Sequence, residues 1–402
     1  MREFDFTAFR RHFPALNIET AYLDSAATAL KPWAVIEATE AFYRHDSGNV
    51  HRSPYAAALS LTDRYEQARR QVADWLAAPA ADAVVWTRGA TESINLVAQS
   101  YARPRLQPGD EIIVSEAEHH ANLVPWLMAA QHTGARVVKW PLDAGLLPSP
   151  ATLSPLLSHR TRVVAVTQMS NVTGGCPDLP AITALTRRFP QAVIVVDGAQ
   201  GAVHQPLNVT KEDIDFYAFS GHKLYGPTGI GVLYGKPSLL AQMSPWQGGG
   251  KMLSEASFAG FTPLAAPHRF EAGTPNIAGV IGLGAALDWL AGQDRQAAER
   301  YSASLADLAE ERLSALPGFR AFRCPGSPLL SFDFERIHHQ DIAMILAQEG
   351  IALRAGQHCA QPLMASLGVT GTLRASFAPY NTPADVQRLA AATEKALGML
   401  RE

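Results

Sequence analysis

The residues with the clearest chemical potential lie in the segment SGHKLYGP, residues 220–227. This segment directly follows an apolar run that ends at Phe219, so Lys223 should project from the end of a strand. A lysine amine whose pKa is lowered by burial or by a neighbouring cation can form a Schiff base with a carbonyl cofactor. Ser220 and His222 could supply hydrogen-bond donors to a phosphate group. The alternative is an ordinary surface turn with a solvated lysine.

A second candidate is Asp197, which ends the apolar run Val193–Val196. Burying an acid is costly unless a cation accompanies it. The protonated pyridine nitrogen of pyridoxal 5'-phosphate (PLP) would be such a cation, because PLP needs an acid there to remain an electron sink. Asp197 is equally consistent with a helix N-cap, which is the commoner reason for an aspartate after a strand.

Two further polar clusters follow apolar runs, in TRGATES (residues 87–93) and SEAEHHAN (residues 115–122). Glycine followed by small hydroxyl residues at a helix start can bind an anion, or Thr91 can have only a capping role. A planar histidine in the second cluster could stack on a cofactor ring and move protons near neutral pH, or simply be solvated. His119 and His120 diverge in direction and lack a third ligand nearby, which disfavours a metal site.

The three cysteines, Cys176, Cys324 and Cys359, are too few for a disulfide framework. Cys359 lies in RAGQHCAQP (residues 354–362), where the flanking glycine and proline predict an exposed loop and a nearby cation would favour the thiolate. Cys176 has a similar setting between glycine and proline, and either thiol could be a small buried hydrophobe. Arg374, in a predicted strand, is either a bidentate clamp for a carboxylate or a member of a surface ion pair.

The elements that must position these residues form a regular pattern. Short apolar runs alternate with helical stretches at Val84–Trp86, Ile112–Val114, Val137–Val138, Val163–Val166, Val193–Val196, Phe216–Phe219 and Gly231–Tyr234. This alternation predicts an α/β fold with a mainly parallel sheet that helices cover on both faces. Ligands of such sheets gather at the carboxyl ends of the strands, where most of the polar clusters lie.

After about residue 280 the pattern changes. Strands are predicted at Leu329–Phe334, Ile351–Arg354 and Thr372–Phe377, and helices at Ile281–Leu290, Arg300–Leu316, Asp341–Glu349 and Pro383–Leu400. Two or three strands with several helices predict a smaller α/β domain.

Composition narrows the function further. The 402 residues are 47% hydrophobic and 18% charged, with 34 basic and 37 acidic side chains and a net charge of -3. No basic stripe is evident, so we expect no nucleic-acid partner. The N-terminal segment lacks an apolar signal core and the apolar runs are too short to span a bilayer, which predicts a soluble, cytoplasmic protein without a membrane partner. Neither GxxxxGK[ST] nor GxGxxG follows an early strand, which disfavours a nucleotide-binding enzyme.

Taken in order, the segments resemble the class V aminotransferase group of fold-type I PLP enzymes, and within it the cysteine desulfurases. The shared sequence motifs span nearly the whole chain: GATES, EHHAN, SNVTG, VDGAQ, SGHKLYGPTGIG, EAGTPN, RAGQHCAQP and RASFAPYN. The resemblance implies the PLP-dependent transferase fold type I. Its large PLP-binding domain (residues 20–270) would contain a mainly parallel seven-stranded sheet. A smaller α/β domain (residues 1–19 and 271–402) would carry the cysteine loop.

The resemblance also implies how each residue would contribute to cofactor binding. Lys223 would be the Schiff-base lysine, Asp197 the partner of the pyridine nitrogen, and His119 the ring that stacks on PLP and helps proton transfer. The remaining cofactor contacts would come from Asn171 and Gln200 on the ring-oxygen side and from Thr91, Ser220 and His222 at the phosphate. Thr274, in EAGTPN, would reach the phosphate of a partner subunit, which implies a homodimer with shared sites.

For the reaction, the resemblance implies removal of sulfur from L-cysteine to give L-alanine. Arg374, with Asn171, would bind the substrate, and Cys359 would take the sulfur as a persulfide and pass it to an acceptor protein similar to SufE. The short loop between Gly356 and Pro362 is similar to that of group II enzymes. The sequence motifs are most similar to those of the bacterial cysteine sulfinate desulfinase branch, which implies activity on cysteine sulfinate and selenocysteine as well.

Some questions stay open at this stage. Ala90 stands where many members of the family carry a second threonine, which leaves one phosphate contact in doubt. Another class V reaction, such as transamination or a kynureninase-like cleavage, and a non-catalytic scaffold with the same fold are the alternatives. The sequence does not decide the preferred substrate, the acceptor protein or the downstream pathway, such as iron–sulfur cluster assembly. It also does not decide whether Cys176 or Cys324 has a role.

Overall fold

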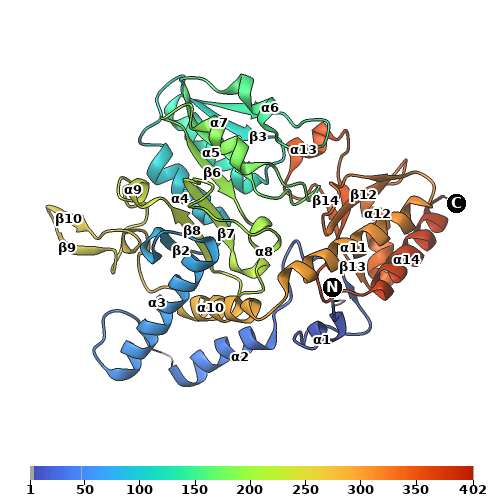
Figure 1. Cartoon of the computed structure of the whole chain (residues 1–402), viewed down its shortest axis with the longest axis horizontal. Helices are drawn as coiled ribbons and strands as arrows, with labels where there is room; N and C mark the ends of the chain where they lie inside the picture. The colour runs from blue at the N-terminus through green and yellow to red at the C-terminus, as the bar shows by residue number, and fades with distance from the viewer. Residues whose placement is uncertain (1–3, 47, 402) are drawn as a thin grey trace.

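The computed structural model describes residues 4–46 and 48–401, arranged around one large and one small sheet (Figure 1). The large sheet has the strand order β2-β8-β7-β6-β5-β3-β4. Its strands are β2 (Val84–Thr87), β3 (Glu111–Ser115), β4 (Arg136–Trp140), β5 (Thr161–Thr167), β6 (Val193–Asp197), β7 (Phe216–Ser220) and β8 (Gly231–Gly235). Only β8 runs against its neighbours within this sheet. The prediction of a mainly parallel seven-stranded sheet is therefore confirmed.

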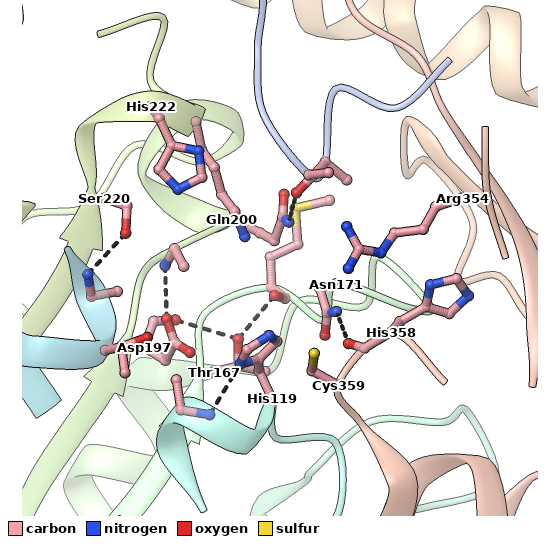
Figure 2. Close-up of a pocket in the computed structure, with 18 of the residues that line it drawn as sticks. His119, Thr167, Asn171, Asp197, Gln200, Ser220, His222, Arg354, His358 and Cys359 are labelled. Atoms are coloured by element: carbon pink, nitrogen blue, oxygen red, sulfur yellow. Dashed lines mark hydrogen bonds between the residues drawn. The ribbon is translucent and has the colours of Figure 1, made fainter. Parts of the chain in front are cut away.

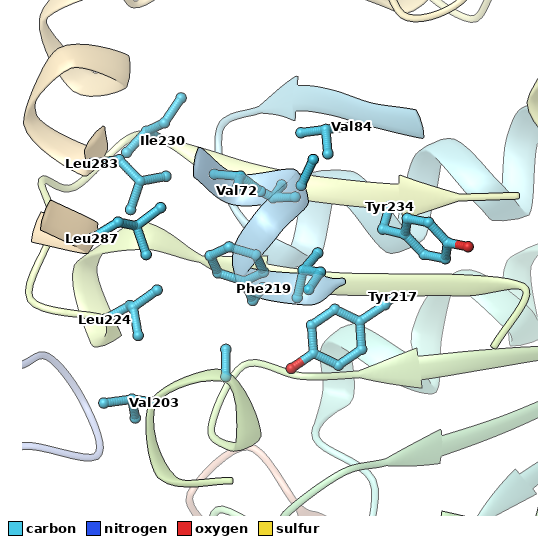
Figure 3. Packing of buried hydrophobic residues seen from close by; sticks show 14 of the residues in the cluster. Val72, Val84, Val203, Tyr217, Phe219, Leu224, Ile230, Tyr234, Leu283 and Leu287 are labelled. Carbon is cyan, nitrogen blue, oxygen red and sulfur yellow. The ribbon is translucent and has the colours of Figure 1, made fainter. Parts of the chain in front are cut away.

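Helices cover both faces of this sheet because consecutive strand residues point to opposite sides. In β7, Tyr217 and Phe219 belong to one buried cluster, whereas Phe216 and Ala218 belong to another. Figure 3 shows the first cluster, in which Phe219 lies close to Val72. The helices in this part of the chain are α1 (Phe6–Arg10), α2 (Trp33–Ala41), α3 (Ala56–Leu76), α4 (Ala90–Leu96), α5 (Val124–Thr133), α6 (Pro150–Leu153), α7 (Leu179–Thr186), α8 (Gly201–His204), α9 (Pro237–Leu240) and α10 (Ile277–Ala291).

The smaller sheet is antiparallel and has the order β11-β12-β15-β14. Its strands are β11 (Phe319–Ala321), β12 (Leu329–Phe334), β14 (Arg354–Gly356) and β15 (Thr372–Ser376), and its helices are α11 (Arg295–Ser314), α12 (His339–Gln348), α13 (Gln361–Ser366) and α14 (Pro383–Arg401). A third buried cluster fills the space between this sheet and α11, α12 and α14. Figure 1 shows this unit in orange and red beside the large sheet.

The single strand predicted at Ile351–Arg354 is wrong, because the chain forms two strands there. Strand β13 (Ile351–Ala352) pairs in parallel with β1 (Ala21–Tyr22) from the N-terminal segment. Arg354 then begins β14, which pairs with β15 instead. The partner of β13 is far away in the sequence, so a local pattern could not reveal the change.

The division between the domains at residue 270 remains a prediction, and the packing of α10 favours a later boundary. Helix α10 contacts α2 and α3, and its buried side chains belong to the same cluster as those of the large sheet. Phe9 and Phe13 of the N-terminal segment pack against Trp289 of α10, with ring centroids 5.4 and 5.5 Å apart. We therefore propose that the small domain begins after Ala291.

Two further features complete the architecture. Strands β9 (Leu253–Ser257) and β10 (Gly260–Pro263) form a hairpin that projects from the large sheet (Figure 1), with the side chains of Phe258 and Phe261 exposed. Among the helices of the described residues, none combines the length and the apolar character needed to cross a membrane.

A buried ion pair connects α3 to the large sheet. The Arg69 guanidinium donates to the Glu271 carboxylate over 2.6 Å and to the carbonyl of Val84 over 2.8 Å. The same carboxylate accepts the backbone N–H of Trp86 over 2.9 Å. Both side chains of this pair are almost fully buried, and the more exposed Glu66, which also pairs with Arg69, would compensate only part of the Arg69 charge if Glu271 lost its own.

We therefore expect Glu271→Gln to destabilise the fold by about 3 kcal/mol or more. Glu40→Gln, which breaks an exposed pair between Glu40 and Arg44, should change stability by at most about 0.5 kcal/mol. Guanidinium denaturation followed by circular dichroism measures both effects. Equal midpoints for the two variants would contradict a stabilising role of the Arg69–Glu271 pair.

Candidate active site

The candidate site is a cavity of about 220 Å³ at the carboxyl ends of β5, β6 and β7, closed on one side by the small sheet. Ten of the eleven residues predicted for the site line it: Thr91, His119, Asn171, Asp197, Gln200, Ser220, His222, Lys223, Cys359 and Arg374. They come from segments that are far apart in the sequence, and Figure 2 shows how most of them converge. The eleventh, Thr274, lies in a neighbouring hollow.

The inner wall of the cavity contains Asp197, at the end of β6. Its side chain is nearly fully buried, and burial raises the pKa of the carboxyl group. One carboxylate oxygen accepts the backbone N–H of Ala199 over 2.9 Å, which is the only hydrogen bond to this carboxylate from the described residues. The other oxygen remains able to accept a hydrogen bond from a ligand.

Lys223 lies in a short 3₁₀ turn that directly follows β7. Burial lowers the pKa of its amine to about 8, and the positive charges of Arg374 and Arg354 add to this effect, whereas Asp197 opposes it. A substantial fraction of the amine is therefore neutral near physiological pH, as a nucleophilic lysine requires. The alternative of a solvated surface lysine does not agree with this environment.

His119 presents a neutral imidazole to the cavity. Its Nδ1 accepts the backbone N–H of Ala121 over 3.0 Å, so the proton of the neutral ring resides on Nε2. Burial lowers the pKa of the ring to about 4, and the positive charge of Lys223 contributes to this decrease. The ring can therefore stack on a planar ligand while carrying a proton at Nε2.

Another end of the cavity is lined by polar groups near the close backbone contact between Gly89 and Gly231. The hydroxyl of Ser220 accepts the backbone N–H of Ala90 over 2.8 Å. A Cβ atom at Gly231 would lie only 2.3 Å from the Cα atom of Gly89, so a glycine is required where β8 passes this loop. Thr91 and His222 also line an adjacent hollow, which makes this end of the site open toward Gly229.

Arg374, on β15, is almost fully buried, which excludes the surface ion pair considered from the sequence. Its guanidinium donates to the carbonyl of Asn171 over 2.8 Å and to the Asp24 carboxylate over 3.3 Å. Its buried Nε has no hydrogen-bond partner among the described residues. This arrangement holds the guanidinium in place, and its remaining N–H groups can bind an anionic ligand in the cavity that Arg374 lines.

The Cys359 loop is held in an unusual backbone conformation. His358 and Cys359 both have positive φ angles, 52° and 54°, which are unfavourable for side chains with a Cβ atom. Two hydrogen bonds stabilise the loop: His120 N–H donates to the Cys359 carbonyl over 2.7 Å, and the Asn171 amide donates to the His358 carbonyl over 2.8 Å. The Cys359 sulfur points into the cavity (Figure 2). Cys176 instead lines a separate cavity.

Gln200 was predicted to contact the ring-oxygen side of a cofactor, and the structure buries its side chain in the cavity wall. Its amide donates to the carbonyl of Ala26 over 2.8 Å. The contact fixes the N-terminal segment against the site.

Several residues of the cavity were missed from the sequence. Arg354 lies directly opposite Arg374 across the pairing of β14 and β15, and its guanidinium points into the cavity (Figure 2). Thr167 ends β5, and its hydroxyl donates to the carbonyl of Met169 over 2.9 Å. His358, in the Cys359 loop, is buried. The arginine three residues before Gln357 is a local signal that could have identified Arg354, whereas no neighbouring residue marks Thr167.

A match to a family model settles the assignment that the geometry suggests: the model of Aminotransferase class-V matches residues 21–389. The chain belongs to the class V aminotransferase family. The cysteine desulfurase CsdA of Escherichia coli (strain K12) is 64% identical over 400 residues, which cover 100% of both chains. A probable cysteine desulfurase of Vibrio cholerae is 48% identical, covering 98% of each chain.

Solved structures of class V cysteine desulfurases show the same fold. The crystal structure of CsdA (S-sulfonic acid) from Escherichia coli has a TM-score of 0.94 and covers 99% of this chain and 100% of that one. The apo structure of cysteine desulfurase from Thermococcus onnurineus NA1, 33% identical, has a TM-score of 0.93 and covers 100% of this chain and 99% of that one. The predicted family, fold and enzyme class, cysteine desulfurase, are confirmed.

This class V family is PLP-dependent, in agreement with the predicted cofactor. The residues present fit PLP. Asp197 has a carboxylate oxygen free for a ring nitrogen, and the lowered pKa of Lys223 suits an amine that condenses with an aldehyde. Ser220, His222 and the narrow contact between Gly89 and β8 provide small, polar surroundings for a phosphate.

The lowered pKa of Lys223 predicts how the apoprotein takes up PLP at different pH values. The neutral amine is the reactive form, so the uptake rate should rise with pH and level off above about pH 8 to 9, as the amine loses its proton. Stopped-flow absorbance after PLP addition measures this rate. A rate that continues to increase to about pH 10.5 would show that the amine has the ordinary pKa of lysine.

Proposed function

We propose that this protein converts L-cysteine to L-alanine and that Cys359 takes the sulfur as a persulfide. The observation that carries the proposal is that Lys223, Arg374 and the Cys359 thiol line a single cavity. An amine that moves a proton, a cation that binds a carboxylate and a nucleophilic sulfur are the three groups that the reaction requires. The identity of the cysteine desulfurase relatives supports it.

Substrate binding is assigned to Arg374 and Asn171. The Arg374 guanidinium would donate to the substrate carboxylate through N–H groups that Asn171 and Asp24 do not use, while the carbonyl of Asn171 and the Asp24 carboxylate hold it in place. Fixing the carboxylate orients the Cα–H bond relative to the Lys223 amine. Asn171 also contacts the Cys359 loop, so the positions of substrate and nucleophile depend on the same residue.

Proton transfer is assigned to Lys223, Asp197 and His119. When bound, PLP supplies an electron sink for the pair released at the substrate Cα. Asp197 would accept a hydrogen bond from the ring nitrogen and keep it protonated, and the Lys223 amine would take the Cα proton. His119 holds a proton at Nε2, where it can be delivered within the cavity.

In the sulfur step, the Cys359 thiolate attacks the substrate sulfur. An S–S bond forms and the Cβ–S bond breaks, with its electron pair remaining on the substrate carbon, which then takes up a proton to become alanine. The exposed Cys359 would pass its outer sulfur to the thiol of an acceptor protein similar to SufE. Cysteine sulfinate and selenocysteine can lose their side-chain group without this attack.

Cys359→Ser should therefore abolish alanine formation from L-cysteine while most activity on cysteine sulfinate and selenocysteine remains. Steady-state assays of alanine, with and without a candidate acceptor protein, measure all three substrates. Cys176→Ser is the matched control, because Cys176 lines a different cavity, and it should leave every rate unchanged.

An equal loss on all three substrates in Cys359→Ser would contradict the nucleophilic role. Labelled sulfur on Cys359 after reaction with labelled cysteine separates this proposal from transamination or a kynureninase-like cleavage, which need no thiol. A protein that is colourless after incubation with PLP, with Lys223 unmodified after borohydride reduction, would favour the scaffold alternative.

We also propose a cytoplasmic homodimer in which Thr274 completes the partner subunit's phosphate site. Thr274 is exposed and does not line the candidate active-site cavity of the same chain. It lines a neighbouring hollow together with Gly229 and Gln247. The open end of the cavity is lined by Thr91 and His222 and also reaches Gly229. An exposed threonine near this opening suits a contact with a second copy of the chain.

Thr274→Ala should weaken PLP binding by about tenfold, because it removes a hydrogen bond to a charged group. Thr210→Ala, which changes an exposed threonine near Ala77, is the control and should leave the affinity unchanged. Fluorescence titration with PLP gives the affinities, and analytical ultracentrifugation gives the oligomeric state. A monomer with full PLP affinity in Thr274→Ala would contradict the shared site.

A further inference from the structure

Glu118 is a buried acid directly before His119, with its side chain 1% exposed. One carboxylate oxygen accepts the backbone N–H of Thr167 over 2.8 Å, and the other accepts the Asn122 side-chain amide over 2.7 Å. The Asn122 carbonyl is itself occupied by the Trp126 indole N–H over 3.0 Å, which fixes the orientation of the amide. Thr167 and Asn122 both donate to Glu118, and the Ser115 hydroxyl is a third hydrogen-bond partner, so the position suits a carboxylate, which only accepts, better than an amide.

The hydrogen bonds of Glu118 reach the cavity wall in two directions. Asn122 donates its backbone N–H to the carbonyl of His119 over 2.8 Å, within the turn that also fixes the imidazole. Thr167 is paired in register with Asp197 across β5 and β6, and its hydroxyl lies 3.3 Å from the Asp197 carbonyl. Glu118 therefore contacts the segment that presents His119 and the end of β5, which is paired with the strand that presents Asp197. Glu118 itself does not line the cavity.

The charge at Glu118 has no cation to balance it among the described ion pairs. Burial raises the pKa of Glu118 to about 8, the negative charge of Asp197 adds to the rise, and the donors on Asn122 and Ser115 oppose it. Two neighbouring buried acids are unfavourable in isolation. Their cost decreases when a cation lies against Asp197, which is where the protonated ring nitrogen of PLP would lie.

We propose that Glu118 is a positioning residue: it orients His119 through Asn122, and its negative charge beside Asp197 helps retain the proton on the ring nitrogen of bound PLP. The inference rests on the proposed function, because it assigns that proton a role in the reaction. Asp197 on β6 is the charged group that faces Glu118, and the side chains of Asn122 and Ser115 are its polar neighbours.

The test uses the PLP-loaded protein and the visible absorbance of the bound cofactor as a function of pH. In Glu118→Gln, the midpoint of the absorbance transition should move to lower pH by about one unit, since the loss of a negative charge beside Asp197 destabilises the protonated form of the bound cofactor. The kcat with L-cysteine should decrease about tenfold while KM stays within about twofold, because Arg374 is untouched. In Glu118→Asp, which retains the charge, the midpoint should lie close to that of the unmodified protein.

The matched control is Glu116→Gln. Glu116 lies two positions earlier and pairs with Lys139, whose side chain is exposed, so its charge is compensated locally. This variant should have the midpoint and kcat of the unmodified protein. A shift as large as that of Glu118→Gln would show that any loss of negative charge in this segment has the same effect, and would overturn the proposal.

A purely structural role would also overturn it. In that case Glu118→Gln would lower the melting temperature but leave the absorbance midpoint and kcat unchanged. If Glu118→Gln does not fold, Asn122→Ser is used instead. This variant removes the amide that donates to Glu118 and so favours the protonated acid, and the absorbance midpoint should again move to lower pH. An unchanged midpoint would contradict the proposal. Absence of alanine formation in the unmodified protein would instead refute the proposed function, whereas the absorbance midpoint tests Glu118 independently.

Discussion

The site depends on the placement of one buried acid and one buried amine at the carboxyl edge of the large sheet. Asp197 and Lys223 follow adjacent parallel strands, β6 and β7, so the pairing of these strands sets their separation. Each group is costly to bury, and each moderates the pKa shift of the other. The apolar clusters on both faces of the sheet provide the stability that makes this cost affordable.

The remaining groups are arranged around this pair by contacts between distant segments. Arg374 and Cys359 come from the small sheet and its loop, yet Asn171, in the loop that follows β5, binds both the Arg374 guanidinium and the carbonyl of His358. The N-terminal segment contributes Asp24, which pairs with Arg374. Substrate-binding and nucleophilic groups therefore acquire their geometry only when the three parts of the chain are packed together.

The sequence was sufficient to predict the strands of the large sheet and the residues at their ends, because apolar runs followed by polar residues are local patterns. For Lys223, Asp197 and Cys359 the residues alone left alternatives open, and the family resemblance of their flanking motifs was needed to predict one site, where all three line a single cavity. It could not reveal that the chain between Ile351 and Arg354 divides into two strands, since β13 pairs with β1 and β14 with β15. Burial of Arg374 is likewise a tertiary property.

Residues that act through pairing were the ones missed. Arg354 belongs to the site because it lies opposite Arg374, and Thr167 because its strand lies beside β6. The residues next to Arg354 and Thr167 in the sequence do not by themselves predict that these side chains line a site. The resemblance placed the boundary of the small domain at residue 270. The contacts of α10 with α2 and α3, which only the folded chain shows, favour a later boundary.

The parallel pairing of β1 with β13 has a consequence for how the protein is made. Ala21 leaves the ribosome long before its partner Ile351 is synthesised. The isolated bridge between Asp24 and Ser376 requires a still later segment. Strand β1 must therefore remain unpaired until both segments have been translated. A chain truncated before Ile351 would contain Lys223 but lack the loop that places Cys359 in the same cavity.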